Sequence, residues 1–293
     1  MIDRRAWLCS LLPLAGCSLQ PDQDHAGPDA PADGPLPRPV RVAWVFSSGG
    51  PRGFVHVGVV KALEELRLKP DLIVGASAGA LVGVLCAAGL PAAAMETLAL
   101  EMPVSRLLRL AVGAEQRLSG GAVADFVRDE LRGLGQGPLL EQLPIMVACV
   151  SQRLADRMVV AFTRGDAGLA VQAAAAIEGR FTPVRIRGQR HADADLVMPL
   201  PVRLARALGA QRVLAVDASA HEDKAPPGAA AYRESDLRKR ALTRPDAALA
   251  DVLLHPDIGY WASTTREYRQ RLIDAGYRDT LAAAARIQAL HAG

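Results

Sequence analysis

The chain has 293 residues, of which half are apolar and 22% are charged, so it can form a sizeable hydrophobic core. Its net charge is only +3, its acidic and basic residues are interspersed, and aromatic residues make up 4%, which argues against a nucleic-acid partner. The cysteines form neither a CxxC motif nor a Cys/His cluster, and this spacing supports neither a zinc site nor a disulfide scaffold. They are Cys9, Cys17, Cys86 and Cys149.

The amino terminus resembles a bacterial lipoprotein signal peptide. Arg4 and Arg5 precede an uncharged stretch over residues 6–16, which is too short to span a bilayer as a helix but suits a signal-peptide core. The stretch ends in Leu-Ala-Gly followed by Cys17, the pattern at which lipoproteins are cleaved and acylated. We therefore expect residues 1–16 to be removed and Cys17 to carry lipid. The alternatives are an ordinary secretory signal and a buried amino-terminal helix.

Residues 17–39 are rich in proline, aspartate and alanine and have no apolar period. This composition predicts a flexible tether between the lipidated cysteine and a folded domain over 40–293. Several acyl chains hold a protein on a membrane where one chain alone binds weakly. Ser18 after the cysteine resembles the sorting pattern for the outer membrane, so we expect a lipid-anchored protein of the bacterial cell envelope, on the periplasmic face of that membrane.

From residue 40 onward, strand and helix patterns alternate. An apolar β-branched run at Val40–Phe46, a helical period at Arg52–Leu66, a short apolar strand at Leu72–Val74 and a helix at Ala80–Ala88 form a βαβ unit. Such units favour a mostly parallel sheet with helices on both faces, so we expect an α/β three-layer sandwich formed by one domain. Further strands are predicted at 145–150, 158–162 and 212–216, and further helices at 122–132, 169–177, 201–208, 263–275 and 280–290.

The segment Gly75-Ala76-Ser77-Ala78-Gly79 has the G-x-S-x-G pattern of a nucleophile elbow. A predicted strand precedes it and a predicted helix follows it, as that turn requires. The glycines permit a strained turn that projects the serine oxygen, and the helix amino terminus places N–H groups beside it. We therefore predict that Ser77 is a nucleophile. A glycine-rich turn without chemistry is the alternative.

A second glycine-rich loop, residues 49–53, follows the first predicted strand and lies at the same edge of the sheet. Its free backbone N–H groups can form an oxyanion hole. Because Pro51 has no N–H, the candidate donors are Gly49, Gly50 and Arg52, together with Ala78 after the nucleophile. No GKS or GxGxxG arrangement supports nucleotide binding.

These motifs together resemble the bacterial branch of the patatin-like phospholipases. The resemblance is carried by residues 48–53, 58–65, 71–83, 181–186, 193–202 and 255–259, and so spans nearly everything after residue 40. It implies a patatin-like fold and a hydrolase that cleaves the acyl ester of a phospholipid or lysophospholipid through an acyl-enzyme. It implies no metal or cofactor, and it makes membrane lipid the expected partner.

The family uses a Ser-Asp dyad, and the resemblance makes Asp193 the base for Ser77. Asp193 is preferred over Asp195 because it lies eight residues before Pro201, as the family's aspartate does before the proline of its Leu-Pro-Val segment. The sequence departs from the family pattern in three places: at Ser48, at the Ala194-Asp195 pair and at Glu178. Asp195 adds a second carboxylate next to the base.

Two other functions are compatible with the sequence. One is a lipid-binding lipoprotein that keeps the fold without turnover. The other is a Ser-His-Asp hydrolase, for which Ser77, Asp217 and His255 have the required order, although that fold normally has more strands before its elbow.

Three further features lie outside these motifs. Residues 102–112 have leucines at helical spacing and predict either a core helix or an interfacial helix; residues 232–245 predict an exposed charged loop or short helix. Cys86 and Cys149 are expected to be buried free thiols.

Overall fold

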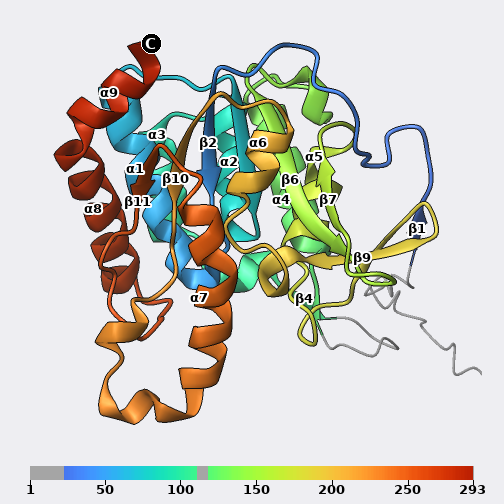
Figure 1. Cartoon of the computed structure of the whole chain (residues 1–293). Helices are drawn as coiled ribbons and strands as arrows, with labels where there is room; N and C mark the ends of the chain where they lie inside the picture. Colours follow the sequence, from blue (N-terminus) through green and yellow to red (C-terminus); the bar gives the residue numbers. More distant parts are fainter. Residues whose placement is uncertain (1–22, 111–117, 293) are drawn as a thin grey trace, which may run out of the picture.

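The computed structural model describes residues 23–110 and 118–292, which fold around a mixed β-sheet (Figure 1). Within this part of the chain the sheet has nine strands, in the order β1-β8-β9-β6-β3-β2-β10-β11, with β7 also paired to β6. The strands are β1 Asp24–His25, β2 Val42–Phe46, β3 Leu72–Ala76, β6 Met146–Arg153, β7 Val159–Phe162, β8 Val184–Ile186, β9 Gln189–Asp193, β10 Arg212–Val216 and β11 Val252–Leu254. The predicted signal peptide and Cys17 lie outside the described residues.

The centre of the sheet is parallel. Strands β6, β3, β2, β10 and β11 run in one direction, with Val45 opposite Val74 on one side and Ala215 on the other. Strands β7 and β9 pair antiparallel to β6, and β8 pairs antiparallel to β9. The prediction of an α/β fold with a mostly parallel central sheet is confirmed.

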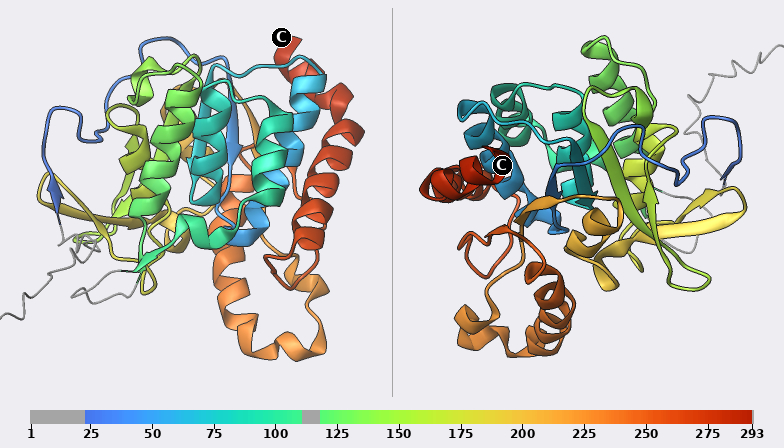
Figure 2. Two further views of the ribbon diagram at one scale, coloured as in Figure 1. Left: turned by 180° about the vertical axis from the view of Figure 1, so that it is seen from behind. Right: turned by 45° about the horizontal axis from the view of Figure 1, so that its top comes forward.

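Helices cover both faces of the sheet, because the parallel strands are apolar on both sides. Along β2, Trp44 and Phe46 contribute to one core, whereas Ala43 and Val45 contribute to the other. The first face carries α1 Phe54–Glu65, α2 Ala78–Ala87, α3 Ala92–Glu101, α4 Gly121–Gly133, α5 Ala167–Ala174, α8 Arg266–Ala282 and α9 Ala284–Ala292 (Figure 2). The opposite face is covered by α6 Val202–Ala207 and the end of α7 Arg233–Ala247. The predicted three-layer arrangement is therefore present.

Helices α1 and α8 pack closely because glycines face each other at their crossing. A Cβ built on Gly58 of α1 would lie 1.9 Å from the carbonyl oxygen of Ile273. A Cβ built on Gly276 of α8 would lie 2.2 Å from the carbonyl oxygen of Val55. The backbones thus meet where any larger residue would push them apart.

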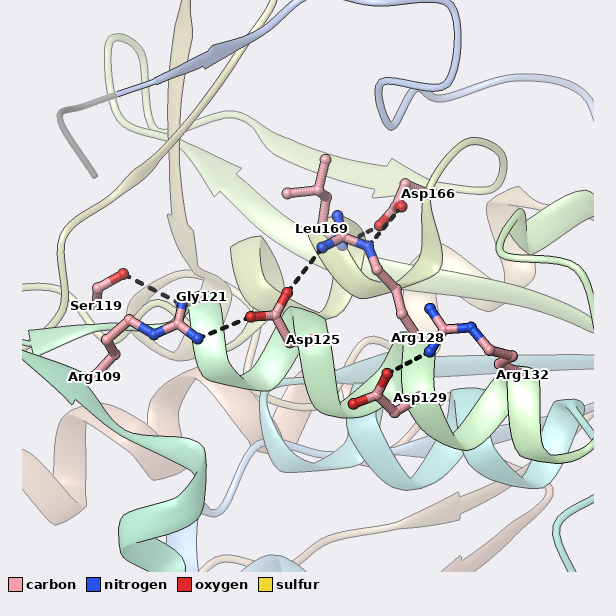
Figure 3. Close-up of polar contacts among 9 residues, drawn as sticks. All are labelled: Arg109, Ser119, Gly121, Asp125, Arg128, Asp129, Arg132, Asp166 and Leu169. Carbon is pink, nitrogen blue, oxygen red and sulfur yellow. Dashed lines mark hydrogen bonds and ion pairs between the residues drawn. The ribbon is translucent and has the colours of Figure 1, made fainter. Parts of the chain in front are cut away.

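Helix α4 is fixed to its neighbours by ion pairs (Figure 3). Arg128 of α4 contacts Asp166, 2.9 Å away, and the same carboxylate caps α5 by accepting a hydrogen bond from the N–H of Leu169. Asp125 of α4 accepts a hydrogen bond from Arg109 at 2.9 Å. These contacts hold α4 against α5 and against β4 Arg109–Leu110.

The chain before residue 40 differs from the predicted flexible tether. Within 23–39, β1 pairs with β8, Ala32 bridges Arg164, and Ala30 is buried. The prediction of a flexible tether is therefore wrong for residues 23–39, which pack against the domain. The folded domain was predicted to begin at residue 40. Backbone pairing at the sheet edge overrides proline-rich composition, and composition alone does not reveal such pairing.

Residues 102–112 also differ from the prediction, whereas the charged segment after Tyr232 is helical, one of its two predicted alternatives. Residues 102–112 do not form a helix as far as they are described: a 3₁₀ turn at Val104–Leu107 leads into β4, which pairs with β5 Leu118–Ser119. Tyr232 ends a 3₁₀ turn at Pro227–Tyr232, and residues 233–245 belong to the fifteen-residue helix α7, whose start projects from the domain (Figure 1). Elements α3, β8, β9 and β11 lie where none is predicted. In the described residues, no helix has the length and apolar character needed to cross a bilayer.

We expect Gly58→Ala to lower the free energy of unfolding by about 3 kcal/mol, because the new Cβ forces α1 away from α8. Urea unfolding followed by circular dichroism measures this change. The matched control is Gly133→Ala at the exposed end of α4, where a Cβ meets nothing within 4 Å. This control should raise the free energy of unfolding by about 0.5 kcal/mol. Equal effects of the two variants would contradict the packing argument.

Candidate active site

Ser77 lies in the turn between β3 and α2 and has a strained backbone. Its φ of 53° and ψ of −123° fall in a region that residues with a side chain rarely adopt, and it is only 5% exposed. Glycines allow the turn: a Cβ on Gly75 would lie 2.4 Å from the carbonyl oxygen of Gly79, and one on Gly79 would lie 2.3 Å from that of Phe46. The G-x-S-x-G segment therefore has the geometry of a nucleophile elbow.

The sheet brings Asp193 to Ser77. Strand β6 pairs with β3 up to Val150 and with β9 from Ser151, while β7 pairs across both stretches and so occupies the other edge. Strands β3 and β9 must therefore share one edge of β6 and run towards each other. Ala76 lies opposite Val150 and Asp193 lies opposite Ser151, so Ser77 and Asp193 meet where the two strands end.

The Asp193 carboxyl is buried at 2% exposure. Its Oδ1 accepts a hydrogen bond from the N–H of Asp195 at 2.9 Å, whereas the buried Oδ2 has no partner among the described residues. Burial raises the pKa of Asp193 to about 7; the nearby Ser77 hydroxyl lowers it and the Asp195 carboxylate raises it.

The glycine-rich loop lies directly beside the elbow. A Cβ on Gly53 would lie 2.3 Å from the Cβ of Ala78, so the 3₁₀ turn at Gly50–Gly53 packs against the start of α2. The N–H groups of Gly49, Gly50 and Ala78 have no acceptor in the described part of the chain. N–H groups without an acceptor are the kind of donor that an oxyanion hole uses.

The prediction of Arg52 as a further donor is wrong. Its N–H donates to the carbonyl of Gly49 at 3.0 Å inside the 3₁₀ turn. Its guanidinium donates to the carbonyl of Tyr260 at 2.6 Å. The N–H of Arg52, which the sequence predicts to be free, is therefore used by a hydrogen bond within the turn itself.

An apolar cavity of about 260 Å³ opens beside Ser77. Ser77 and Ala78 form part of its wall, and Gln172 and Thr264 are the other polar residues that line it in the described chain. The remaining wall comes from α1 to α4, from the glycine-rich loop and from the segments before β4 and after α5, with Val57, Leu81, Leu85, Met95, Phe126, Leu107 and Phe181 among its residues. Such a space suits a hydrocarbon chain.

A polar cluster on the other side of Asp193 joins three segments. Asp195 Oδ1 accepts hydrogen bonds from the hydroxyl of Ser48 and from Nζ of Lys239, the latter at 2.7 Å. Lys239 of α7 also donates to Ser48 Oγ at 3.3 Å. Ser48 and Asp195 are two of the departures from the family pattern, and sequence reasoning missed Lys239, whose only signal is a run of charges.

The structure does not assemble a Ser-His-Asp triad. Asp217 and His255 line a separate polar cavity to which Ser77 does not contribute. Nε2 of His255 contacts the Ser219 carbonyl at 3.0 Å, and its ring stacks on His221. The triad alternative is therefore wrong.

The histidine on α1 is buried beside the glycine-rich loop. Nε2 of His56 contacts the Ser47 carbonyl at 2.9 Å, and burial lowers the pKa of His56 to about 4, so the ring is neutral.

Both predicted thiols are free, and burial raises the pKa of Cys86 and of Cys149 to about 12. No group of His, Cys, Asp or Glu within 23–110 and 118–292 is arranged to hold a metal ion.

Comparisons with known proteins agree with this geometry. The family model described as patatin-like phospholipase matches residues 44–206, more than half of the chain. An uncharacterized NTE family protein of Mycobacterium tuberculosis is 35% identical over 185 residues, covering 62% of this chain and 50% of that protein. Lysophospholipase NTE1 of Saccharomyces cerevisiae is 27% identical over 188 residues, covering 63% of this chain and 11% of that protein. The chain thus spans about half the length of the mycobacterial relative and far less of the yeast protein.

The fold also matches a solved structure. VipD from Legionella pneumophila has a TM-score of 0.54 and 14% sequence identity, covering 88% of this chain and 67% of that chain. At this identity the likeness concerns the fold.

Because Ser77 is strained, we expect Ser77→Gly to raise the free energy of unfolding by about 1 kcal/mol relative to Ser77→Ala. Both variants lack the hydroxyl, but only glycine adopts this backbone conformation without strain. Chemical denaturation of the two proteins measures the difference. An alanine variant that is as stable as the glycine variant, or more stable, would contradict the strain argument.

Proposed function

Because the chain belongs to the patatin-like phospholipase family, we propose that it is a lipid acyl hydrolase with Ser77 as nucleophile and Asp193 as base. The observation that carries the proposal is the meeting of a strained, buried serine with a buried carboxyl whose Oδ2 has no partner among the described residues. The name of the yeast relative, a lysophospholipase, supports the same reaction class.

In the proposed reaction, the ionised Asp193 takes the proton of the Ser77 hydroxyl as Oγ attacks the ester carbonyl. The N–H groups of Gly49, Gly50 and Ala78 stabilise the oxyanion that forms. Collapse of this intermediate breaks the ester bond, and the proton passes from Asp193 to the departing alcohol. Water then attacks the acyl-enzyme in the same way and releases the fatty acid.

The apolar cavity supports a phospholipid or lysophospholipid as substrate. No charged side chain lines the cavity in the described chain, so it favours a hydrocarbon chain over a polar group. Leu108 lines the cavity and is 39% exposed, and Leu196, close to Asp193 in the chain, is also exposed. Apolar side chains exposed near the site suit contact with a lipid surface.

We also propose that the protein is anchored in the bacterial outer membrane, facing the periplasm, by acylation of Cys17. The support is the sequence of residues 1–18: paired arginines, a short apolar stretch, Leu-Ala-Gly-Cys and the following serine. Such an anchor would hold the enzyme at its substrate.

We expect Ser77→Ala and Asp193→Asn each to lower kcat/KM for lysophospholipid hydrolysis by about 10³-fold or more, because each removes one member of the dyad. In the unaltered protein, kcat/KM should rise with pH through about 7, since Asp193 must be ionised to act as a base. Fatty-acid release measured across pH tests both statements.

The control is His255→Ala, which should change kcat/KM less than twofold because His255 lies in the separate cavity. Loss of activity in this variant would contradict the dyad. A fluorophosphonate probe that fails to label the unaltered protein would favour a lipid-binding protein without turnover.

For the anchor, we expect Cys17→Ala to move the protein from the detergent phase to the aqueous phase in Triton X-114 partitioning. Incorporation of radiolabelled palmitate in a Gram-negative host should be lost in the same variant. Unchanged partitioning and labelling would show that Cys17 carries no lipid.

A further inference from the structure

The cluster of Ser48, Asp195 and Lys239 connects the proposed base to the glycine-rich loop. The backbone N–H of Asp195 donates a hydrogen bond to Oδ1 of Asp193. Oδ1 of Asp195 in turn accepts hydrogen bonds from the Lys239 ammonium and from the Ser48 hydroxyl. Ser48 directly precedes Gly49, one of the candidate oxyanion donors, and its N–H donates to the Pro199 carbonyl at 2.8 Å. One carboxylate thus bridges the two halves of the site.

The cluster is partly buried, so its charges are less screened by water than charges on the open surface. The side chains of Lys239 and Asp195 are 26% and 35% exposed, and Ser48 is buried. Burial alone would raise the pKa of Asp195, but the Lys239 ammonium, with its hydrogen bond and that of Ser48, outweighs burial and lowers it. Asp195 is therefore ionised two residues from the proposed base, and its charge opposes ionisation of Asp193.

The other charged groups around the cluster have partners of their own. Arg52 of the 3₁₀ turn acts on Asp195 from a distance, while its guanidinium is bonded to the Tyr260 carbonyl. On α7, Asp236 accepts the Tyr260 hydroxyl and Arg240 pairs with Glu222. Asp217 of the polar cavity bonds to the N–H of Ser219. Among the described residues, Lys239 is the cation in direct contact with Asp195.

We propose that Lys239 is a positioning residue of the site: it compensates the charge of Asp195 and, through it, fixes Asp193 against the glycine-rich loop. The inference rests on the proposed hydrolysis and adds a residue beyond the segment 44–206 that matches the family model. Helix α7 reaches back to the site from the projecting part of the chain (Figure 1).

The test compares four proteins with the unaltered one: Lys239→Met, Lys239→Arg, Asp195→Asn and the double variant Lys239→Met/Asp195→Asn. The readouts are the pH profile of kcat/KM on a soluble short-chain ester and the ¹³C NMR titration of the Asp193 carboxyl. A short ester keeps membrane binding out of the measurement.

In Lys239→Met, the midpoint of both titrations should move to higher pH by roughly one pH unit, because Asp195 then repels the Asp193 carboxylate without compensation. At pH 7 this shift lowers kcat/KM about fivefold. Lys239→Arg should keep the original midpoint. Asp195→Asn alone should move it to lower pH, and the double variant should lie close to the unaltered protein.

Arg238→Met is the matched control, since Arg238 is the adjacent cation on α7 but is exposed and pairs with Glu234. It should leave both titrations unchanged. An unshifted midpoint in Lys239→Met, or a double variant that behaves like Lys239→Met, would overturn the proposal.

The two proposals fail in different ways. If the unaltered protein hydrolyses no ester, the proposed function fails, whereas the NMR titration of Asp193 still tests the role of Lys239 because it needs no turnover. If Lys239→Met does not fold, the opposite shift expected for Asp195→Asn still decides the outcome.

Discussion

The site depends on the length of β6, which extends beyond β3 and uses the same edge to pair with β9. Two strands that run towards each other along one edge must end face to face. The residues at that junction are Ser77 and Asp193, which are 116 positions apart in the chain. Because backbone hydrogen bonds hold both strand ends, the separation of the two side chains is set by the sheet, and flexible loops contribute little.

Burial at this junction has two opposed effects. It excludes water and provides an apolar space beside the serine, which suits an acyl chain. It also disfavours the charged form of Asp193, and the adjacent Asp195 adds a like charge. The Lys239 ammonium, delivered by a helix on the far side of the glycine-rich loop, opposes that second effect. Ser48 and Asp195, which both depart from the family pattern, thus contact each other. Both also contact Lys239, which lies outside the residues 44–206 that the family model matches.

Several features could be predicted because their causes are local. The nucleophile elbow follows from glycines on both sides of Ser77, and the close approaches at Gly75 and Gly79 explain why both are needed. The parallel sheet follows from apolar strands that alternate with helices. Two predictions were wrong because backbone groups find partners that composition does not reveal: Asp24 and His25 pair with β8, and the N–H of Arg52 is used within its own turn.

By itself, the sequence determined the alternation of strands and helices, the glycines on both sides of Ser77 and the glycine-rich loop at 49–53, because each is a pattern of residues within a few positions of one another. The choice of Asp193 needed the resemblance to a family. Only the tertiary structure excluded His255, joined Ser48 to Asp195 and brought Lys239 to them from α7. These outcomes depend on strand order and helix packing that bring together residues 44 to 191 positions apart, and no local pattern encodes such contacts.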